Sequence, residues 1–159
     1  MIVVVMGVTG TGKSSVAHRL AEELRLSFVE GDDFHDQASI EKMGRGEPLT
    51  EQDRQPWLDR LNGELRRHEP EGSVLACSAL TASSRRRLAD GLTDVRFVFL
   101  RGRKDVLRHR LEKREGHFAG AELLDSQLDT LEVPEDAVLV DVGDPLEVVL
   151  AHALAGLRG

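Results

Sequence analysis

The chain has 159 residues, of which 40% are apolar and 31% are charged, a length and composition typical of one soluble globular domain. Its formal net charge of −7 disfavours a nucleic acid partner held through phosphate contacts. Cys77 is the only cysteine, which excludes an intrachain disulfide framework and favours a reducing, cytoplasmic environment.

Five short apolar runs alternate with longer charged stretches along the chain. Most of the runs are rich in valine and leucine with little polar alternation, which is typical of strands buried on both faces of a parallel sheet. They cover residues 2–6, 27–30, 73–77, 95–100 and 137–142. The alternation predicts one α/β domain over residues 1–159, a three-layer sandwich with helices on both faces of a five-stranded parallel sheet. The first run is only a strand long, so we expect neither a signal peptide nor a membrane span.

A glycine-rich segment follows the first predicted strand and precedes a helical pattern. Residues 7–14 read GVTGTGKS, which matches the phosphate-binding loop G-x-x-x-x-G-K-[ST] in its strand-to-helix context. The amides of such a loop form an anion nest, the lysine reaches the β- and γ-phosphates, and the last hydroxyl ligates Mg²⁺. We therefore predict Lys13 as a catalytic cation and Ser14 as the metal ligand. The predicted ATP-binding residues are Gly7, Thr9, Gly10, Thr11, Gly12, Lys13, Ser14 and Ser15.

Two carboxylates and an imidazole follow the second predicted strand, at the sheet edge where ligands bind in this architecture. Asp32 is the candidate base that accepts the proton of an alcohol, and Asp33 is its local rival. A helix N-cap is the alternative role for either residue, because aspartate is a favoured cap. His35 lies three positions beyond Asp32.

The next segment places two cations around a predicted helix start. Thr50, with Asp53 three residues later, is a near match to a capping box. We expect Trp57 to anchor the following helix in the core, with stacking on a substrate as its alternative role. Lys42 and Arg54 flank the loop that should close over an acceptor, and arginine offers a planar fork for a carboxylate or phosphate. A role as solvated surface cations has equal weight for both.

Further polar residues follow the third and fourth predicted strands. Ser78 ends the third strand beside Cys77, which we expect to be a small buried residue and not a catalytic thiol. Arg110 and Arg114 share one helix face next to a glycine-bearing stretch, which suits a lid that closes on ATP and excludes water. A salt-bridged surface helix is the alternative of equal weight. His117 is a minor candidate for a proton role.

Taken in order, these motifs resemble those of the gluconokinases, small phosphate-loop kinases, over nearly the whole chain. Beyond the loop, the matching segments are Gly31-Asp32 with His35, Ile40-x-Lys42-Met43, Gly46-x-Pro48-Leu49, Asp53-Arg54-x-Pro56-Trp57-Leu58, Cys77-Ser78-Ala79-Leu80, Arg114-x-Gly116-His117-Phe118, Leu123-Leu124-x-Ser126-Gln127 and Leu131-Glu132-x-Pro134. The loop alone indicates only nucleotide phosphates, whereas the middle motifs in this order are far more specific.

The resemblance implies a P-loop kinase fold like that of the nucleoside monophosphate kinases, with a mobile lid near residues 114–127. It implies ATP and Mg²⁺ as co-substrates and phosphorylation of D-gluconate at its 6-hydroxyl. It favours Asp32 over Asp33 as the base, makes Arg110 and Arg114 lid residues with a catalytic role, and allows a homodimer. The expected substrate-binding residues are Asp32, His35, Lys42, Arg54, Ser78 and His117.

Four positions depart from the pattern of the family. Asp36 stands where the family usually has proline, Ser39 where it has asparagine, Thr81 where it has lysine, and Ser84 where it has tyrosine. The loss of a cation at 81 and an amide at 39 would loosen gluconate binding or shift the preference to another sugar acid. The reaction class is unaffected.

Two other functions fit part of the sequence. A kinase for shikimate or a nucleoside monophosphate would share the loop, but the triple-glycine strand end expected of the former is missing. A nucleotide-gated regulatory switch would need no small acceptor, although the chain has no Asn-Lys-x-Asp guanine motif. An assay with a panel of acceptors separates these functions from a gluconate kinase.

Overall fold

The computed structural model describes residues 1–113 and 120–159. The strands are β1 (Ile2–Met6), β2 (Ser27–Glu30), β3 (Ser73–Ala76), β4 (Val95–Arg101) and β5 (Val138–Asp141). The helices are α1 (Lys13–Leu24), α2 (Gln37–Gly44), α3 (Glu51–Arg67), α4 (Ala82–Ala89), α5 (Lys104–Glu112), α6 (Gly120–Thr130) and α7 (Leu146–Arg158), with a 3₁₀ helix η1 (Gly31–Phe34) after β2.

The strands form one parallel sheet in the order β2-β3-β1-β4-β5, which confirms the predicted sheet. β1 is central, and every one of its residues is buried, as its continuous apolar sequence predicts. The chain leaves β1 for β2 and β3 on one side and then crosses to β4 on the other. Ligands in such sheets bind beyond the carboxyl ends of the strands, where the direction of winding changes.

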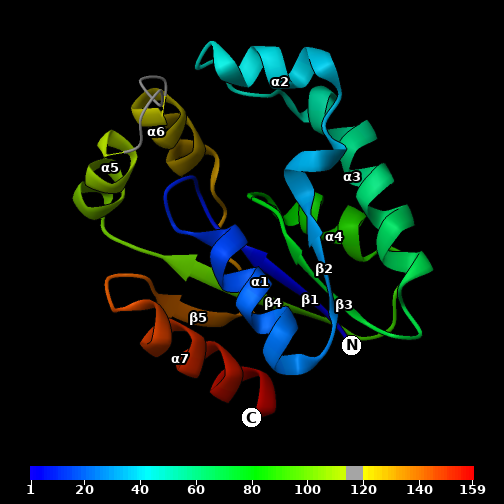
Figure 1. Cartoon of the computed structure of the whole chain (residues 1–159). Coiled ribbons are helices and arrows are strands. Elements are labelled where there is room, and N and C mark those ends of the chain that lie inside the picture. The colour runs from blue at the N-terminus through cyan, green and yellow to red at the C-terminus, as the bar shows by residue number, and fades with distance from the viewer. Residues whose placement is uncertain (114–119) are drawn as a thin grey trace.

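Alternate residues of β1 face opposite sides of the sheet and belong to two separate cores. On one side Val3 and Val5 pack with residues of α1, α5 and α7. On the other side Val4 and Met6 pack with Trp57 and with further residues of α3 and α4. Figure 1 shows α1 and α7 on one side of the sheet and α3 and α4 on the other, which confirms the predicted three layers.

Helix α3 is fixed at its start and along one side, which matters because it contributes to the site. Thr50 Oγ1 accepts from the Asp53 amide at 3.0 Å, and Asp53 Oδ2 accepts from the Thr50 amide at 2.9 Å, so the predicted capping box is complete. Leu58, Leu61 and Leu65 form the buried stripe of the helix. A capped and packed helix holds its first turns in a defined position.

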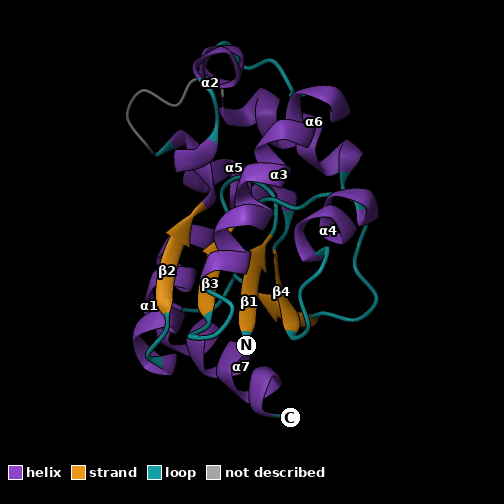
Figure 2. Ribbon diagram, turned by 90° about the vertical axis from the view of Figure 1, so that its right-hand side faces the viewer, coloured by secondary structure: helices purple, strands orange, loops and turns teal. Residues whose placement is uncertain are grey.

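Two helices lie beyond the carboxyl ends of the strands, α2 and α6, as Figure 2 shows. They lie over the edge of the sheet where the polar segments after β1, β2 and β3 emerge and where α1 and η1 begin. Within residues 1–113 and 120–159, no helix combines the length and apolar character needed to cross a membrane.

Candidate active site

A cavity of about 300 Å³ lies at the carboxyl ends of β1, β2 and β3. This volume is at the lower end of the range for small-molecule sites. The predicted site residues that line it are Thr9, Gly10, Gly12, Lys13, Ser14, Ser15, Asp32, His35, Arg54 and Ser78. The fold therefore brings the phosphate loop and most of the predicted acceptor residues to one cavity.

Two glycines allow the phosphate loop to take its shape. A Cβ atom added at Gly7 would lie 2.6 Å from the carbonyl oxygen of Leu100, and Gly12 begins α1 with a φ of +83°, a conformation that favours glycine. Gly7 and Thr11 do not line the cavity. The buried Thr11 hydroxyl donates to the Val8 carbonyl at 2.8 Å, so this residue stabilises the loop from within.

The lysine and the serine of the loop motif both bond to neighbouring oxygens. Lys13 Nζ donates to the Val8 carbonyl at 3.2 Å. Ser14 Oγ donates to Glu30 Oε2 at 2.5 Å, and both residues line the cavity. A hydroxyl beside a carboxylate supplies the oxygen ligands that Mg²⁺ takes together with nucleotide phosphates and water. The residues present therefore fit a magnesium ion.

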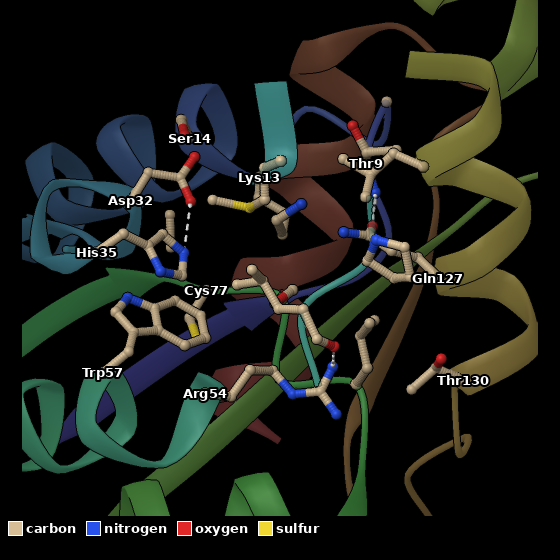
Figure 3. A pocket seen from close by; sticks show the side chains of 18 of the residues that line it. Thr9, Lys13, Ser14, Asp32, His35, Arg54, Trp57, Cys77, Gln127 and Thr130 are labelled. Carbon is tan, nitrogen blue, oxygen red and sulfur yellow. Dashed lines mark hydrogen bonds and ion pairs between the residues drawn. The ribbon is translucent and has the colours of Figure 1, made fainter. Parts of the chain in front are cut away.

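Asp32 lies at the cavity beside a buried histidine, as Figure 3 shows. Its Oδ1 is 3.7 Å from His35 Nε2, and 82% of the Asp32 side chain is exposed. The His35 ring stacks on Trp57 with ring centres 4.1 Å apart, and Trp57 Nε1 donates to the Gly31 carbonyl at 2.8 Å. Trp57, 3% exposed, therefore anchors α3 as predicted and also forms a wall of the cavity.

The capping alternative for the two neighbouring aspartates does not apply to this fold. The N-cap of η1 is Glu30, and the N-cap of α2 is Asp36. Asp33 does not line the cavity, whereas Asp32 does. Position alone therefore favours Asp32 over Asp33 as the group that meets a ligand.

The environment of His35 keeps its ring neutral near pH 7. Burial lowers the pKa of His35, against the opposing effect of the Asp32 carboxylate, from an ordinary value of about 6.5. Only 3% of the side chain is exposed. A neutral ring beside Asp32 acts through hydrogen bonding and packing, since it carries no charge to attract a carboxylate.

The two predicted substrate cations have different surroundings. Arg54 lines the cavity with 12% of its side chain exposed. Its guanidinium donates to the Leu49 carbonyl at 3.3 Å and to Glu51 at 3.0 Å, while its buried Nε has no partner among the described residues. Lys42 does not line the cavity; its Nζ donates to Asp53 at 2.8 Å, which lowers the pKa of Asp53 to about 2.

The loop after β3 contributes Ser78 to the cavity and is stabilised by hydrogen bonds from Arg85. Arg85 donates to the carbonyls of Ala79 and Glu132, both at 2.8 Å. Cys77 is 2% exposed, and burial raises the pKa of its thiol to about 12. The thiol is therefore protonated at neutral pH and unreactive, in agreement with the expectation of a small buried residue.

The predicted lid residues are only partly described. Arg110 is not in the cavity; its guanidinium donates to the carbonyl of Val142, directly after β5. Arg114 and His117 lie outside the described residues. Farther along the predicted lid, Leu124 is fully buried.

Two cavity residues that bond to the phosphate loop had no predicted role. Glu30 accepts a hydrogen bond from Ser14. Its place at the end of a predicted strand, directly before Gly31-Asp32, could have indicated a role at the site. Gln127 of α6 accepts from the Thr9 amide through Oε1 at 2.7 Å. This contact joins positions far apart in sequence, so no local pattern indicates it.

The four departures from the family pattern form two helix caps. Asp36 caps α2 by accepting from the Ser39 amide at 2.8 Å. Thr81 caps α4 by accepting from the Ser84 amide at 3.1 Å, and the two hydroxyls are 3.0 Å apart. None of the four residues lines the cavity. Their side chains therefore act on helix starts and do not contact a ligand in this cavity.

Comparisons with known proteins agree with this site. Residues 2–134 match a family model described as an AAA domain. The thermoresistant gluconokinase of Escherichia coli (strain K12) is 40% identical, covering 99% of this chain and 93% of that protein. The gluconokinase of Gluconobacter oxydans (strain 621H) is 49% identical over 84% of this chain and 76% of its own length.

Solved structures show the same likeness. The crystal structure of a gluconokinase from Sinorhizobium meliloti 1021 superposes with a TM-score of 0.90 at 44% identity, covering 99% of this chain and 91% of that one. Identity at this level over nearly the full length, with the phosphate loop and acceptor segments at one cavity, shows common descent. The chain belongs to the gluconokinase family of P-loop kinases.

Proposed function

We propose that this protein transfers the γ-phosphoryl group of ATP to the 6-hydroxyl of D-gluconate. The hydroxyl oxygen forms a bond to the γ-phosphorus while the bond from that phosphorus to the bridging oxygen breaks, and ADP leaves. The hydroxyl proton passes to a carboxylate of the protein. The products are 6-phospho-D-gluconate and ADP.

The phosphate loop would bind the nucleotide. Its amides and the N-terminus of α1 face the phosphates, and Lys13 neutralises charge on the β- and γ-phosphates. Ser14 and Glu30 are the residues that would hold Mg²⁺. When bound, the ion neutralises negative charge on the phosphate oxygens.

The residues after β2 would bind and deprotonate the acceptor. Asp32 accepts the proton, because its carboxylate borders the cavity and is open to a ligand. Arg54 binds the sugar-acid carboxylate with its planar guanidinium, and Lys42 assists from its pair with Asp53. His35, as a neutral ring, and Ser78 complete the acceptor side.

The lid cations belong to this proposal as predictions from the sequence. Arg110 and Arg114 would neutralise the transferring phosphoryl group, for which Arg110 must exchange its bond to Val142 for one to phosphate. His117 would lie with them at the acceptor.

The observation that carries the proposal is one cavity that joins Lys13 and Ser14 to Asp32 and Arg54, in a chain 40% to 49% identical to relatives named gluconokinase. The capping roles of Asp36–Ser39 and Thr81–Ser84 support gluconate itself, since these departures do not alter the cavity wall.

A coupled assay of ADP release tests the proposal with gluconate, idonate, glycerate and shikimate as acceptors. We expect gluconate to give the highest kcat/KM. A higher value for another acceptor would reassign the substrate. ATP hydrolysis that no sugar acid stimulates would favour a regulatory switch instead.

A further inference from the structure

Gln127 is a cavity residue for which the proposed reaction provides no role. It lines the cavity from α6, and its Oε1 accepts from the backbone amide of Thr9 at 2.7 Å. An amide N–H is a donor, so the atom that meets it must be the side-chain oxygen. This chemistry fixes the orientation of the Gln127 amide and leaves its Nε2 amino group as the remaining donor.

The contact changes the set of donors that the phosphate loop offers. The loop binds phosphate through successive backbone N–H groups, and one of them, that of Thr9, is already used by Gln127. Gln127 has an amino group to offer in exchange. The site therefore replaces one backbone donor with one side-chain donor from a different helix.

The position of Gln127 indicates which phosphate this amino group would meet. Figure 3 shows Asp32 on one side of the cavity and Gln127 with Thr9 on the other, with Lys13 between them. A lysine of this motif reaches the β- and γ-phosphates. The phosphoryl group that passes toward Asp32 must therefore lie in the space between these side chains.

The helix that carries Gln127 is held firmly enough to place it. Asp125 on α6 pairs with Lys104 at 2.9 Å and with Arg108 at 3.5 Å, both on α5. Leu124 is fully buried in the core beneath. A packed and ion-paired helix positions a side chain more precisely than a loop does.

We infer that Gln127 binds the terminal phosphate of ATP, with Oε1 holding the phosphate loop at Thr9 and Nε2 donating to a γ-phosphate oxygen. This inference deepens the proposed function and rests on the phosphate loop as the nucleotide site. Gln127 then distinguishes the triphosphate from the diphosphate, which favours binding of ATP and release of ADP.

Two substitutions separate the two ends of the amide. Gln127→Glu keeps an oxygen that accepts from Thr9 but removes the donor and adds a negative charge facing phosphate. Gln127→Ala removes both. Asp129→Asn is the control, since Asp129 is exposed on the same helix and does not line the cavity.

The measurement is calorimetric binding of Mg²⁺ with a non-hydrolysable ATP analogue and, separately, with ADP, in the absence of any acceptor. We expect Gln127→Ala to weaken the analogue about tenfold, the effect of losing one hydrogen bond to a charged group, with ADP changed less than about twofold. Gln127→Glu should weaken the analogue at least as much while its Tm stays that of the unmodified protein. Asp129→Asn should change neither affinity.

Equal weakening of both nucleotides would show that Gln127 only holds the loop, and unchanged affinities would exclude any role; either result overturns the inference. Because no acceptor is present, the outcome is independent of the sugar acid. A protein that discriminates the nucleotides as expected but does not phosphorylate gluconate would refute the proposed reaction alone.

Discussion

The two sides of the cavity differ in how their polar groups are used. On the nucleotide side the Thr9 amide, Lys13 Nζ and Ser14 Oγ each bond to another protein group. On the acceptor side His35 Nδ1 and Arg54 Nε are buried without a partner among the described residues. Buried polar atoms are normally bonded, so the acceptor side has hydrogen-bonding capacity that the protein itself does not fill.

The difference indicates two modes of binding. A nucleotide exchanges the bonds of Lys13 and Ser14 within the protein for bonds to phosphate and its metal ion, while the Thr9 amide stays bonded to Gln127, so its affinity is the net of gains and losses. An acceptor adds bonds at the side of the cavity formed by Trp57. The position of Trp57 is already fixed by its hydrogen bond to Gly31 and its stack on His35. Each of the following predictions tests one side of this contrast.

The largest effect is expected at the nucleotide side. Lys13→Ala removes the cation that faces the β- and γ-phosphates and should lower kcat/KM for ATP about 10³-fold, as loss of a major charge-stabilising donor does. Steady-state kinetics with varied ATP measures it, with Lys113→Ala as a control outside the cavity. Full activity of Lys13→Ala would remove the phosphate loop from the mechanism.

Removal of the base should come next. Asp32→Asn keeps a polar side chain of the same size but cannot accept the proton, so kcat should fall about 10²-fold or more while KM for ATP changes little. Asp33→Asn is the matched control and should leave kcat within about twofold, because surface changes away from a site have small effects. If the two variants exchanged these results, the base would be Asp33.

A smaller effect is expected on KM for gluconate, and it should differ between Arg54 and Lys42, the two cations proposed to bind the sugar-acid carboxylate. Arg54→Ala should raise KM for gluconate about 30-fold, since a hydrogen bond to a charged group contributes about 1.5–3 kcal/mol. Lys42→Ala should raise it only about threefold, within the range for an exposed ion pair, because Lys42, unlike Arg54, does not line the cavity and is paired with Asp53. Equal effects of the two substitutions on KM would contradict the difference in their surroundings.

The smallest predicted effect concerns the free energy of unfolding and involves His35, which stacks on Trp57 at the acceptor side of the cavity. The pKa of His35 is lowered in the fold, so the unfolded chain binds more protons than the native state just below about pH 6.5. Stability should therefore fall as the pH falls from about 6.5 toward the lowered pKa. Among the groups around the ring, Asp32 and Asp36 favour its proton and Arg60 opposes it.

Urea unfolding at several pH values between about 5 and 7.5 measures this fall in the unmodified protein and in His35→Asn. The slope should be shallower in His35→Asn. His152→Asn, which removes an exposed histidine of α7, should keep the original slope. A slope that His35→Asn leaves unchanged would show that another group is responsible.

The sequence predicts those parts of the molecule that depend on local pattern. The buried apolar runs identify the sheet, the spacing of glycines and Lys13 identifies the phosphate loop, and Thr50 with Asp53 identifies the start of α3. Each of these features depends on residues a few positions apart.

Contacts between distant segments were not predictable in this way. The stack of His35 on Trp57 and the bond from Thr9 to Gln127 arise only when the sheet brings separate connections together. Asp53 was expected to cap a helix, yet it also pairs with Lys42 from the preceding helix. The spacing of Thr50 and Asp53 indicates the helix cap, but it does not indicate Lys42 as the second partner of the Asp53 carboxylate.

Trp57 has a practical consequence for measurement. It is the only tryptophan in a chain without tyrosine, and it borders the cavity while stacking on His35. The tryptophan fluorescence of the protein therefore comes from this one position beside the cavity, and a sugar acid that binds there should alter the emission. The unmodified enzyme thus carries an optical sensor that can follow acceptor binding in real time without an attached label.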